Sequence, residues 1–310
     1  MTKIEWVKNK DGTQGRTWNP VTGCSKISPG CQNCYAERMS KRLAGRFGYP
    51  KDEPFRVTLH PERLEEPLRW RKPQMVFVCS MGDLFHEDVP FEFVEEVRAV
   101  MVRCPQHTFQ LLTKRSERML EFARWMADGD HISTAEWPRN VWLGVTAENQ
   151  EQADKRIPVL LQIPAAVRFV SVEPMLGPID LYSYLIIGTD QPGSIMRNGL
   201  DQVICGGETG PKARPMHPDW ARILRDQCQS AGVPFFFKSW GEWMPINPNW
   251  FDGDDRLQNA KGNLLHIGSM GQIQMPGNNF SWLKRVGEKA TGRLLDGRTW
   301  NEMPEVGDTN

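Results

Sequence analysis

The segment MVFVCSMGDLFHEDVPFEFVEEVRAVMVRCPQHTFQLLT, residues 75–113, decides the fold class of this chain. It starts with one nearly continuous apolar run, MVFVCSM (75–81), and ends with a second, TFQLLT (108–113). The apolar residues between these runs recur at the spacing of one helix face: Phe93, Val94, Val97, Val100 and Met101. Apolar strands separated by a helix are typical of a parallel sheet that helices cover on its outer side.

The same alternation extends in both directions along the chain. Further apolar runs follow at intervals of about 30 residues, at NVWLGVT (140–146), VRFVSVE (167–173), VICGG (203–207) and PFFFKSW (234–240). Upstream we expect a strand at TWNPVTG (17–23), a helix at YAERMSKRLAGRFG (35–48), and a short strand and helix at FRVTLHPERLEEPLRW (55–70). A doubly wound sheet and a barrel share this alternation. The count of seven or eight strands favours an α/β fold with a full or partial (β/α) barrel over residues 1–240.

Residues 241–310 differ in character from the rest. Asn, Gly, Pro and Met are enriched there, and little periodicity remains before residue 280. Leu295, Asp296 and Gly297 predict a strand entering a tight turn, with Trp300 beyond it. We expect residues 241–310 to form an irregular C-terminal cap or lid. With Trp240 and Trp243, this lid would close the substrate side of the barrel.

Composition excludes several classes of protein. The 310 residues carry 38 Lys and Arg against 38 Asp and Glu, and 39% are hydrophobic, which excludes a disordered chain and a uniformly basic one. No apolar run approaches the roughly 18 residues of a membrane-spanning helix. The N-terminus, MTKIEWVKNK, has no hydrophobic signal segment. We therefore expect a cytoplasmic protein with no membrane partner.

The seven cysteines are distributed unevenly. An odd number in a long chain argues against a secreted disulfide framework. Four cysteines are scattered, whereas Cys24, Cys31 and Cys34 lie within eleven residues, in CSKISPGCQNC. This C-x6-C-x2-C motif falls on the loop after the first predicted strand.

Three thiolates on one loop can converge on one inorganic centre. Structural zinc sites usually have four ligands, and no fourth Cys or His lies nearby in the sequence. Three ligands suit a [4Fe–4S] cluster whose fourth iron takes a ligand from outside the protein. A disulfide, and a zinc site completed by a distant His or Asp, are the alternatives.

Residues just past the carboxyl ends of parallel strands share one edge of the sheet, where α/β folds carry their sites. In this chain most of them are polar or Gly: Ser80, Gly82, Asp83, Thr113, Lys114, Arg115, Thr146, Glu148, Glu173, Gly206, Gly207, Glu208, Lys238 and Trp240. The alternative at each position is an ordinary polar loop entry. The candidates for a reacting side chain are Cys79, Lys238 and Trp240, and Cys79 is alternatively a buried apolar residue.

Three cysteines on the loop after the first strand of a helix-covered barrel resemble the radical S-adenosylmethionine (SAM) enzymes. The resemblance covers most of residues 17–240. CSMGDLFHEDVP (79–90) followed by FQLLTKRSERM (109–119) looks like the spore-photoproduct-lyase-like branch, and the whole chain resembles a group of phage-encoded proteins with the same motif. The commonest superfamily spacing is C-x3-C-x2-C with an aromatic residue before the third Cys. Here the first gap is longer, Asn33 precedes the third Cys, and Tyr35 follows it.

The resemblance implies two cofactors, a [4Fe–4S] cluster bound by the three cysteines and SAM chelated to its free iron. One electron would break a carbon–sulfur bond of SAM, and the 5′-deoxyadenosyl radical would abstract a substrate hydrogen. The implied SAM contacts are Gly82 and Asp83 at the amino group, Thr113, Lys114 and Glu148 at the carboxylate and ribose, and Gly206 and Gly207 near the adenine. Ser80 and Glu173 complete the candidate cofactor-binding set. A flavodoxin- or ferredoxin-like reductant is the implied partner.

The distribution of charge bears on the substrate. Residues 1–75 carry 15 Lys and Arg against 8 Asp and Glu, whereas residues 241–310 carry 7 against 9. Arg38, Arg42 and Arg46 recur at i, i+4 and i+8 on the predicted helix after the cysteines and form one basic stripe. Such a stripe can neutralise phosphates, or it is only a solvated helix face.

Together with the resemblance, this bias favours a nucleobase or base-derived group in phage DNA hypermodification or repair as the substrate. DNA or a nucleotide would then be a partner, in the cytosol of a bacterial host. One alternative is a radical SAM enzyme acting on a free metabolite or peptide. The other is a zinc-stabilised nucleic-acid-binding module without catalytic activity.

Overall fold

Seven parallel strands form one curled sheet with the order β1-β4-β5-β6-β7-β8-β9. The computed structural model describes residues 4–128, 137–185, 199–246, 256–258, 264–266, 270–274 and 280–305. The strands are β1 (Arg16–Trp18), β4 (Met75–Val78), β5 (Thr108–Thr113), β6 (Val141–Thr146), β7 (Val167–Val172), β8 (Gln202–Gly206) and β9 (Phe235–Ser239). Over the described residues the two edge strands, β1 and β9, do not pair with each other. The fold is therefore α/β with a partial barrel, as the strand count predicts.

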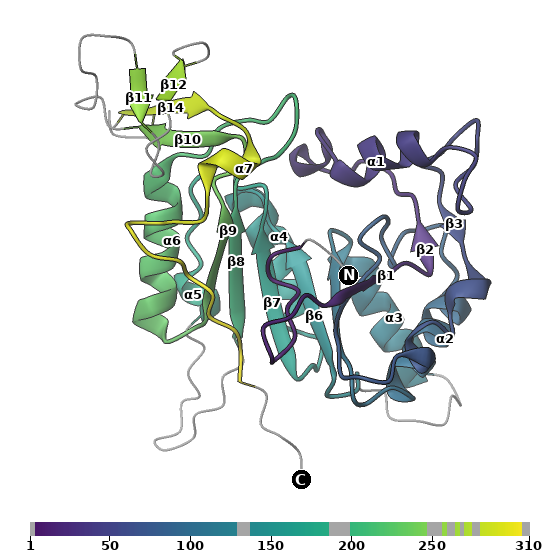
Figure 1. The fold of residues 1–310 in the computed structure, drawn as a ribbon. Coiled ribbons are helices and arrows are strands. Elements are labelled where there is room, and N and C mark those ends of the chain that lie inside the picture. The colour runs from purple at the N-terminus through teal and green to yellow at the C-terminus, as the bar shows by residue number, and fades with distance from the viewer. Residues whose placement is uncertain are drawn as a thin grey trace, which may run out of the picture.

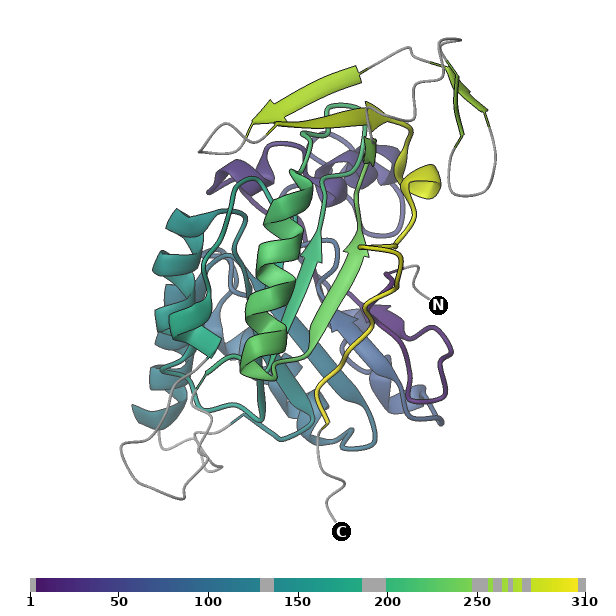
Figure 2. The same cartoon turned by 90° about the vertical axis from the view of Figure 1, so that its left-hand side faces the viewer.

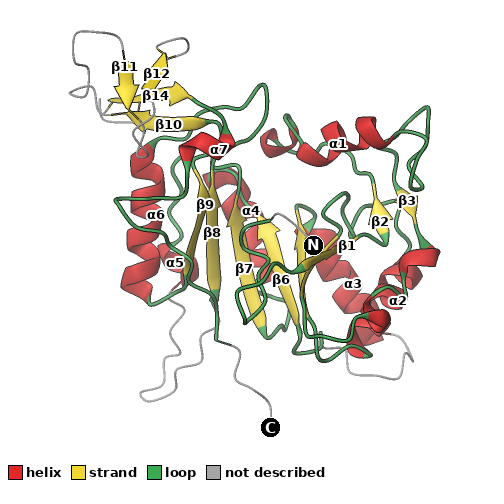
Figure 3. Ribbon diagram, in the orientation of Figure 1, coloured by secondary structure: helices red, strands yellow, loops and turns green. Residues whose placement is uncertain are grey.

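Helices cover the outer face of this half-barrel (Figure 1, Figure 3). They are α2 (Phe91–Val102), α3 (Ser116–Asp128), α4 (Gln150–Leu160), α5 (Tyr182–Leu185) and α6 (Pro218–Ala231). Alternate strand residues such as Phe109, Leu111 and Leu143 pack against helix residues in one continuous apolar core. Because helices fill this side, the functional groups must come from the strand ends or the inner face.

The inner face has its own apolar cluster. Trp6, from the N-terminal hairpin, packs against Phe77 and Phe169 with ring centroids 4.8 and 6.1 Å away. Gly144 on β6 makes room for Phe169, since a Cβ there would lie 2.4 Å from the ring. The half-barrel is thus partly filled from its open side by the chain's first residues.

The segment before β4 departs from the expected pattern. The predicted first strand is divided into β1 and β2 (Val21–Thr22), and β2 pairs only with β3 (Thr58–Leu59), antiparallel and outside the main sheet. The predicted helix within residues 55–70 is two short 3-10 turns, Pro61–Arg63 and Pro67–Arg69. Pro61 and Pro67 begin the two turns, and another proline, Pro67 or Pro73, follows four residues after each turn ends, which prevents a longer helix. The main sheet therefore has seven strands.

Two elements lie over the carboxyl edge of the sheet, α1 (Tyr35–Leu43) beside β1 and the C-terminal strands beside β9 (Figure 1). In the C-terminal segment β10 (Trp243–Ile246), β14 (Phe280–Arg285) and β13 (Met270–Gln274) form an antiparallel sheet. A second pair, β11 (Arg256–Gln258) and β12 (Leu264–His266), and the short α7 (Glu288–Thr291) complete it. Figure 2 shows the strands of this segment above β8, β9 and α6. The described part is thus more regular than the sequence pattern indicates.

The tight turn predicted near Asp296 is present. Leu295 and Arg298 exchange backbone hydrogen bonds, and Asp296 and Gly297 both have positive φ, at 53° and 81°. Two such residues at the centre of a two-residue turn are the type I′ arrangement, which Asp-Gly favours. In the part of the chain that the structure describes, no helix is long and apolar enough to cross a membrane.

Candidate functional site

The cysteine loop is joined to the loop after β4 by a backbone contact. Gly23 forms a parallel bridge with Gly82, and the Gly23 N–H donates to the carbonyl of Met81 at 2.9 Å. A Cβ on Gly82 would lie 2.9 Å from the Gly23 oxygen, and one on Gly23 would lie 2.2 Å from the carbonyl oxygen of Arg56. Both glycines are needed for this close approach, so Cys24 directly follows a rigid junction.

Arg115, just past β5, contacts the first cysteine. Its Nη1 donates to the sulfur of Cys24 and to the carboxylate of Asp83, both at 3.3 Å. Its Nε donates to Glu87, and its Nη2 donates to the Ser25 hydroxyl at 2.7 Å. The Arg115 side chain is only 4% exposed. Burial and the charge of Asp83 raise the pKa of Cys24 to about 12, and Arg115 opposes them.

The candidate residues after β4 and β5 form one network. Asp83 accepts from the Thr113 hydroxyl at 2.8 Å and from the Phe85 N–H at 3.0 Å. Ser80 donates to the Asn19 side chain at 3.2 Å. The Asp83 carboxylate is therefore engaged by protein groups, and Gly82 packs against backbone. The structure thus brings these residues together beside Cys24.

The backbone just before the second cysteine is held by Glu148, which lies just past β6. Glu148 is fully buried and accepts from the Gly30 N–H at 2.8 Å and from Arg156 on α4 at 2.9 Å. Burial acts to raise the pKa of Glu148, but hydrogen bonds from Ser28 and Gly30 and the charges of Arg156 and Lys114 outweigh it, so the pKa is lowered. Glu148 therefore stays ionised and holds the 3-10 turn Pro29–Cys31 in place.

Lys114 supplies positive charge to this part of the loop. Burial acts to raise the pKa of Cys31, but the charge of Lys114 and hydrogen bonds from residues 27 and 28 outweigh it, so this pKa is lowered. Lys114 also lowers the pKa of Glu148. The half-buried Lys114 side chain thus acts electrostatically on both the cysteine loop and the Glu148 carboxylate.

The third cysteine is tied to the loop after β8. Asn33, directly before Cys34, donates to Glu208 at 3.0 Å and to the Lys212 carbonyl at 2.8 Å. Arg214 pairs with Glu208 and donates to the Pro29 carbonyl at 3.0 Å. The loops after β4, β5, β6 and β8 therefore meet the loop after β2, residues 24–34.

The three thiols match a cluster in number and chemistry. None is in a disulfide, and all three are partly exposed. Among the described residues, no group of three or more His, Cys, Asp or Glu side chains is arranged to hold a single metal ion. A tetrahedral zinc with Zn–S bonds of about 2.3 Å needs sulfurs about 3.8 Å apart. A polynuclear cluster holds its thiolates on different iron atoms and so farther apart.

Glu173, just past β7, forms an ion pair with Lys238, which lies within β9 and not past its end as the sequence pattern predicts. Burial acts to lower the pKa of Lys238, but the charge and hydrogen bond of Glu173 outweigh it and raise the pKa. A Cβ on Gly206 would be in ordinary contact with both partners, at 3.4 and 3.6 Å. Gly207 cannot carry a side chain, because its Cβ would lie 2.1 Å from the Trp240 carbonyl oxygen. Gly206 thus lies beside the Glu173–Lys238 ion pair, and Gly207 lies against the backbone of Trp240.

Two of the candidates for a reacting side chain are core residues. Cys79 is 5% exposed and packs in the outer apolar core, and burial raises its pKa to about 12. Trp240 is 6% exposed, donates to the Leu294 carbonyl at 2.9 Å, and packs edge-on against Phe237. Lys238, in its ion pair, is the third candidate.

The basic stripe predicted on one helix over residues 35–48 is divided, because α1 ends at Leu43 and Arg46 lies beyond it. Arg38 lies against Gly210, whose Cβ would overlap the guanidinium. Arg42 and Arg46 are exposed, and the Arg46 side chain donates to the Arg42 carbonyl at 2.6 Å. Arg42 and Arg46 therefore face solvent, whereas Arg38 is only partly exposed.

Some residues of the site have no role in the sequence-based hypothesis: Ser25, Asn33, His86, Arg156 and Arg214. His86 contacts Ser25 at 2.8 Å. Arg115 and Glu208 also take part in the site. The sequence signal for them was their position just past predicted strands, at the carboxyl edge of the sheet. The others are recognised only by their contacts.

Comparison with known proteins gives three results. A search of curated proteins finds no match to this chain. Among solved structures, a Cys-to-Ser mutant of spore photoproduct lyase is similar with a TM-score of 0.40 and 9% sequence identity, over 92% of this chain and 72% of that one. One family model, described as "Protein of unknown function (DUF5131)", matches residues 1–304. The chain belongs to this family.

Proposed function

We propose that this protein is a radical SAM enzyme in which Cys24, Cys31 and Cys34 hold a [4Fe–4S] cluster. The observation that carries the proposal is that three free thiols lie on one loop that meets four other strand-end loops at the carboxyl edge of an open half-barrel. Sites in parallel α/β folds lie at this edge. Three protein thiolates leave one iron of such a cluster for an outside ligand.

The chain's own residues would orient and charge-balance this site. When bound, the cluster would supply one electron to SAM, whose cleavage gives the radical that abstracts a substrate hydrogen. Arg115 holds the Cys24 sulfur, and Glu148 and Asn33 fix the backbone on either side of Cys31. Lys114, whose charge acts on Cys31 and Glu148, is the cation we assign to the SAM carboxylate, since Arg115 is already paired with Asp83.

The substrate we propose is a nucleobase or a base-derived group, with an external flavodoxin- or ferredoxin-like protein as reductant. The excess of Lys and Arg in residues 1–75 supports it, because a phosphate-bearing substrate is attracted to positive charge. A base inside duplex DNA would have to leave the stack to reach the half-barrel.

The test is anaerobic reconstitution of the full-length protein with iron and sulfide. We expect a brown protein with about four iron and four sulfide per chain. With SAM and dithionite it should release methionine and 5′-deoxyadenosine. Cys31→Ala and Cys34→Ala should abolish both the colour and SAM cleavage. Cys104→Ala, in the core between α2 and β5, is the matched control and should retain both.

Two results would overturn the proposal. One is a colourless protein with a single zinc per chain, which would favour a zinc-stabilised module. The other is a loaded cluster with no 5′-deoxyadenosine above the level of the Cys31→Ala variant.

A further inference from the structure

The loop after β8, residues 207–216 and here called the β8 loop, contacts the cysteine loop on one side. The side-chain amide of Asn33 donates to the Lys212 carbonyl at 2.8 Å. In the other direction, the Arg214 guanidinium donates to the Pro29 carbonyl at 3.0 Å. Hydrogen bonds in both directions therefore join the β8 loop to the cysteine loop.

The β8 loop contacts the C-terminal cap on its other side. The indole N–H of Trp243, on β10, donates to the Ala213 carbonyl at 2.7 Å. The guanidinium of Arg285, on β14, donates to the Gly210 carbonyl at 2.9 Å, and the Gly210 N–H donates to the Glu242 carboxylate at 2.8 Å. Trp243 and Arg285 are opposite each other in the β10–β14 pair. The β8 loop therefore holds one end of the cap sheet.

Glu208 takes part in both sets of contacts. Its carboxylate accepts from the Asn33 amide at 3.0 Å and from the Arg214 Nε at 2.9 Å. Its backbone carbonyl accepts from the Glu242 N–H at 3.0 Å. The Glu208 side chain is only 5% exposed, so these protein donors replace water around the carboxylate. One residue thus joins the backbone that enters the cap to the residue directly before Cys34.

The backbone on both sides of this connection is closely packed. A Cβ on Gly207 would lie 2.1 Å from the Trp240 carbonyl oxygen, and one on Gly241 would lie 2.2 Å from the Glu208 carbonyl oxygen. Only glycine allows the two chain segments to approach this closely. A displacement of β10 therefore reaches the β8 loop, because close-packed segments transmit strain.

We propose that Glu208 is a positioning residue that couples the cap strands β10 and β14 to the cysteine loop. The position of the cap then sets the position of the backbone at Asn33 and Cys34. The purpose of this coupling rests on the proposed function: a substrate held by the cap adjusts the cluster site before SAM is cleaved. The coupling itself needs no cluster, so its failure is distinct from a failure to bind iron or to cleave SAM.

The test measures amide hydrogen exchange in iron-free, full-length protein. The amides of residues 31, 32 and 38 are hydrogen-bonded and report on opening of the cysteine loop and α1. Trp243→Phe keeps an aromatic ring but removes the hydrogen bond to the Ala213 carbonyl. We expect exchange at residues 31–38 to become about two- to tenfold faster. Trp282→Phe makes the same change at an exposed ring of the same sheet and should have no effect there.

A double-mutant cycle shows whether the effect passes through Glu208. In a Glu208→Gln background, Trp243→Phe should accelerate exchange at residues 31–38 much less than in wild type, because the connection is already weakened. Asn33→Ala, which removes the donor on the cysteine side, should have the same consequence and serves as a second background.

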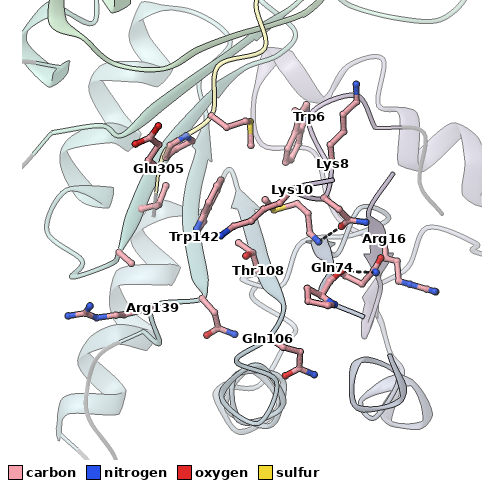
Figure 4. A pocket seen from close by; sticks show the side chains of 18 of the residues that line it. Trp6, Lys8, Lys10, Arg16, Gln74, Gln106, Thr108, Arg139, Trp142 and Glu305 are labelled. Atoms are coloured by element: carbon pink, nitrogen blue, oxygen red, sulfur yellow. Dashed lines mark hydrogen bonds between the residues drawn. The ribbon is translucent and has the colours of Figure 1, made fainter. Parts of the chain in front are cut away.

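Gln74→Ala is the matched control for Asn33→Ala. Gln74 lies at the wall of a cavity of about 1890 Å³ at the amino edge of the sheet (Figure 4), and its amide donates to the Pro73 carbonyl at 2.8 Å. The substitution also removes a side-chain amide donor, but at the edge away from the cysteines. In this background Trp243→Phe should accelerate residues 31–38 as much as in wild type.

The reconstituted protein gives a second readout. The EPR g values of the reduced cluster depend on how its thiolates are oriented. They should shift in Trp243→Phe and Glu208→Gln and stay unchanged in Trp282→Phe. If wild type forms no cluster, the proposed function fails, and the exchange experiment still decides the coupling.

Three results would overturn the proposal. One is unchanged exchange at residues 31–38 in Trp243→Phe. The second is an equal acceleration in Trp282→Phe, which would show general loosening of the cap sheet. The third is an effect of Trp243→Phe as large in the Glu208→Gln and Asn33→Ala backgrounds as in wild type, because the two ends would then act independently.

Discussion

The guanidinium of Arg115 donates a hydrogen bond to the sulfur of Cys24 at 3.3 Å, across 91 residues of sequence. The same nitrogen lies 3.3 Å from the Asp83 carboxylate, so one buried cation joins the loops after β2, β4 and β5. A cation placed on a cysteine sulfur favours thiolate, the form that binds metal. Through these two contacts, Arg115 couples the packing of the half-barrel to the position of the candidate cluster ligand Cys24.

Arg115→Gln should destabilise the protein by about 3–5 kcal/mol, because it leaves the buried Asp83 carboxylate without its charged partner. It should also lower the iron retained after reconstitution. Urea unfolding and iron analysis measure the two effects. Arg69→Gln, whose ion pair with Glu65 is exposed, should change stability by less than about 0.5 kcal/mol. Equal effects of the two variants would contradict the structure.

Glu148→Gln should change how stability depends on pH. The pKa of Glu148 is lowered in the folded protein, so its contribution is present above its unfolded pKa of about 4.3 and is lost as pH falls through the lower folded value. The difference in urea midpoint between wild type and variant should be large at pH 7 and should narrow below about pH 4. A difference that stays constant from pH 7 to pH 3 would contradict this.

Gly23→Ala should cost more stability than Gly12→Ala. Both glycines have positive φ, at 85° and 79°, so both substitutions carry a strain of about 1–2 kcal/mol. A Cβ at residue 23 would also meet the Arg56 carbonyl at 2.2 Å, whereas nothing lies within 4 Å of one at residue 12. Thermal unfolding of the two variants makes the comparison, and equal melting temperatures would show that the junction with Gly82 is not tight.

Alkylation should distinguish the cysteines in reduced, iron-free protein at pH 7. Cys31 has a lowered pKa and should react faster than Cys24, whose pKa burial raises to about 12. Lys114→Gln should slow the reaction of Cys31, and Lys155→Gln should not. Peptide mass mapping after brief iodoacetamide treatment gives the rates. Faster modification of Cys24 than of Cys31 would reverse the prediction.

Gln110→Leu should stabilise the protein by about 1–2 kcal/mol. Gln110 is fully buried between Phe77 and Trp142 on the inner face, and neither polar atom of its side chain has a partner in the structure. Asn140→Leu makes a similar change of shape but removes three hydrogen bonds to backbone carbonyls, so it should destabilise. Chemical denaturation of both variants would show effects of opposite sign.

The order and the type of the elements of the half-barrel follow from local patterns. The run at residues 108–113 is β5 to the residue, and the runs at 140–146 and 167–173 are β6 and β7 with one residue trimmed. These predictions succeed because a strand buried on both faces must be apolar throughout. The same kind of pattern predicted a strand within residues 55–70. That strand, β3, has only two residues and proline follows it closely, so it does not join the main sheet.

The alternation of apolar runs and helix faces, and the spacing of three cysteines, are properties of neighbouring residues, so they can be read along the chain. Which side chains meet around those cysteines depends on the curl of the sheet. Gly30 meets Glu148 across 118 residues and Asn33 meets Glu208 across 175. No local propensity encodes such distances, because they arise only when parallel strands bring their carboxyl ends to one edge. For the same reason, the unpaired Trp142 donor and the cavity at the amino edge emerge only from the folded chain.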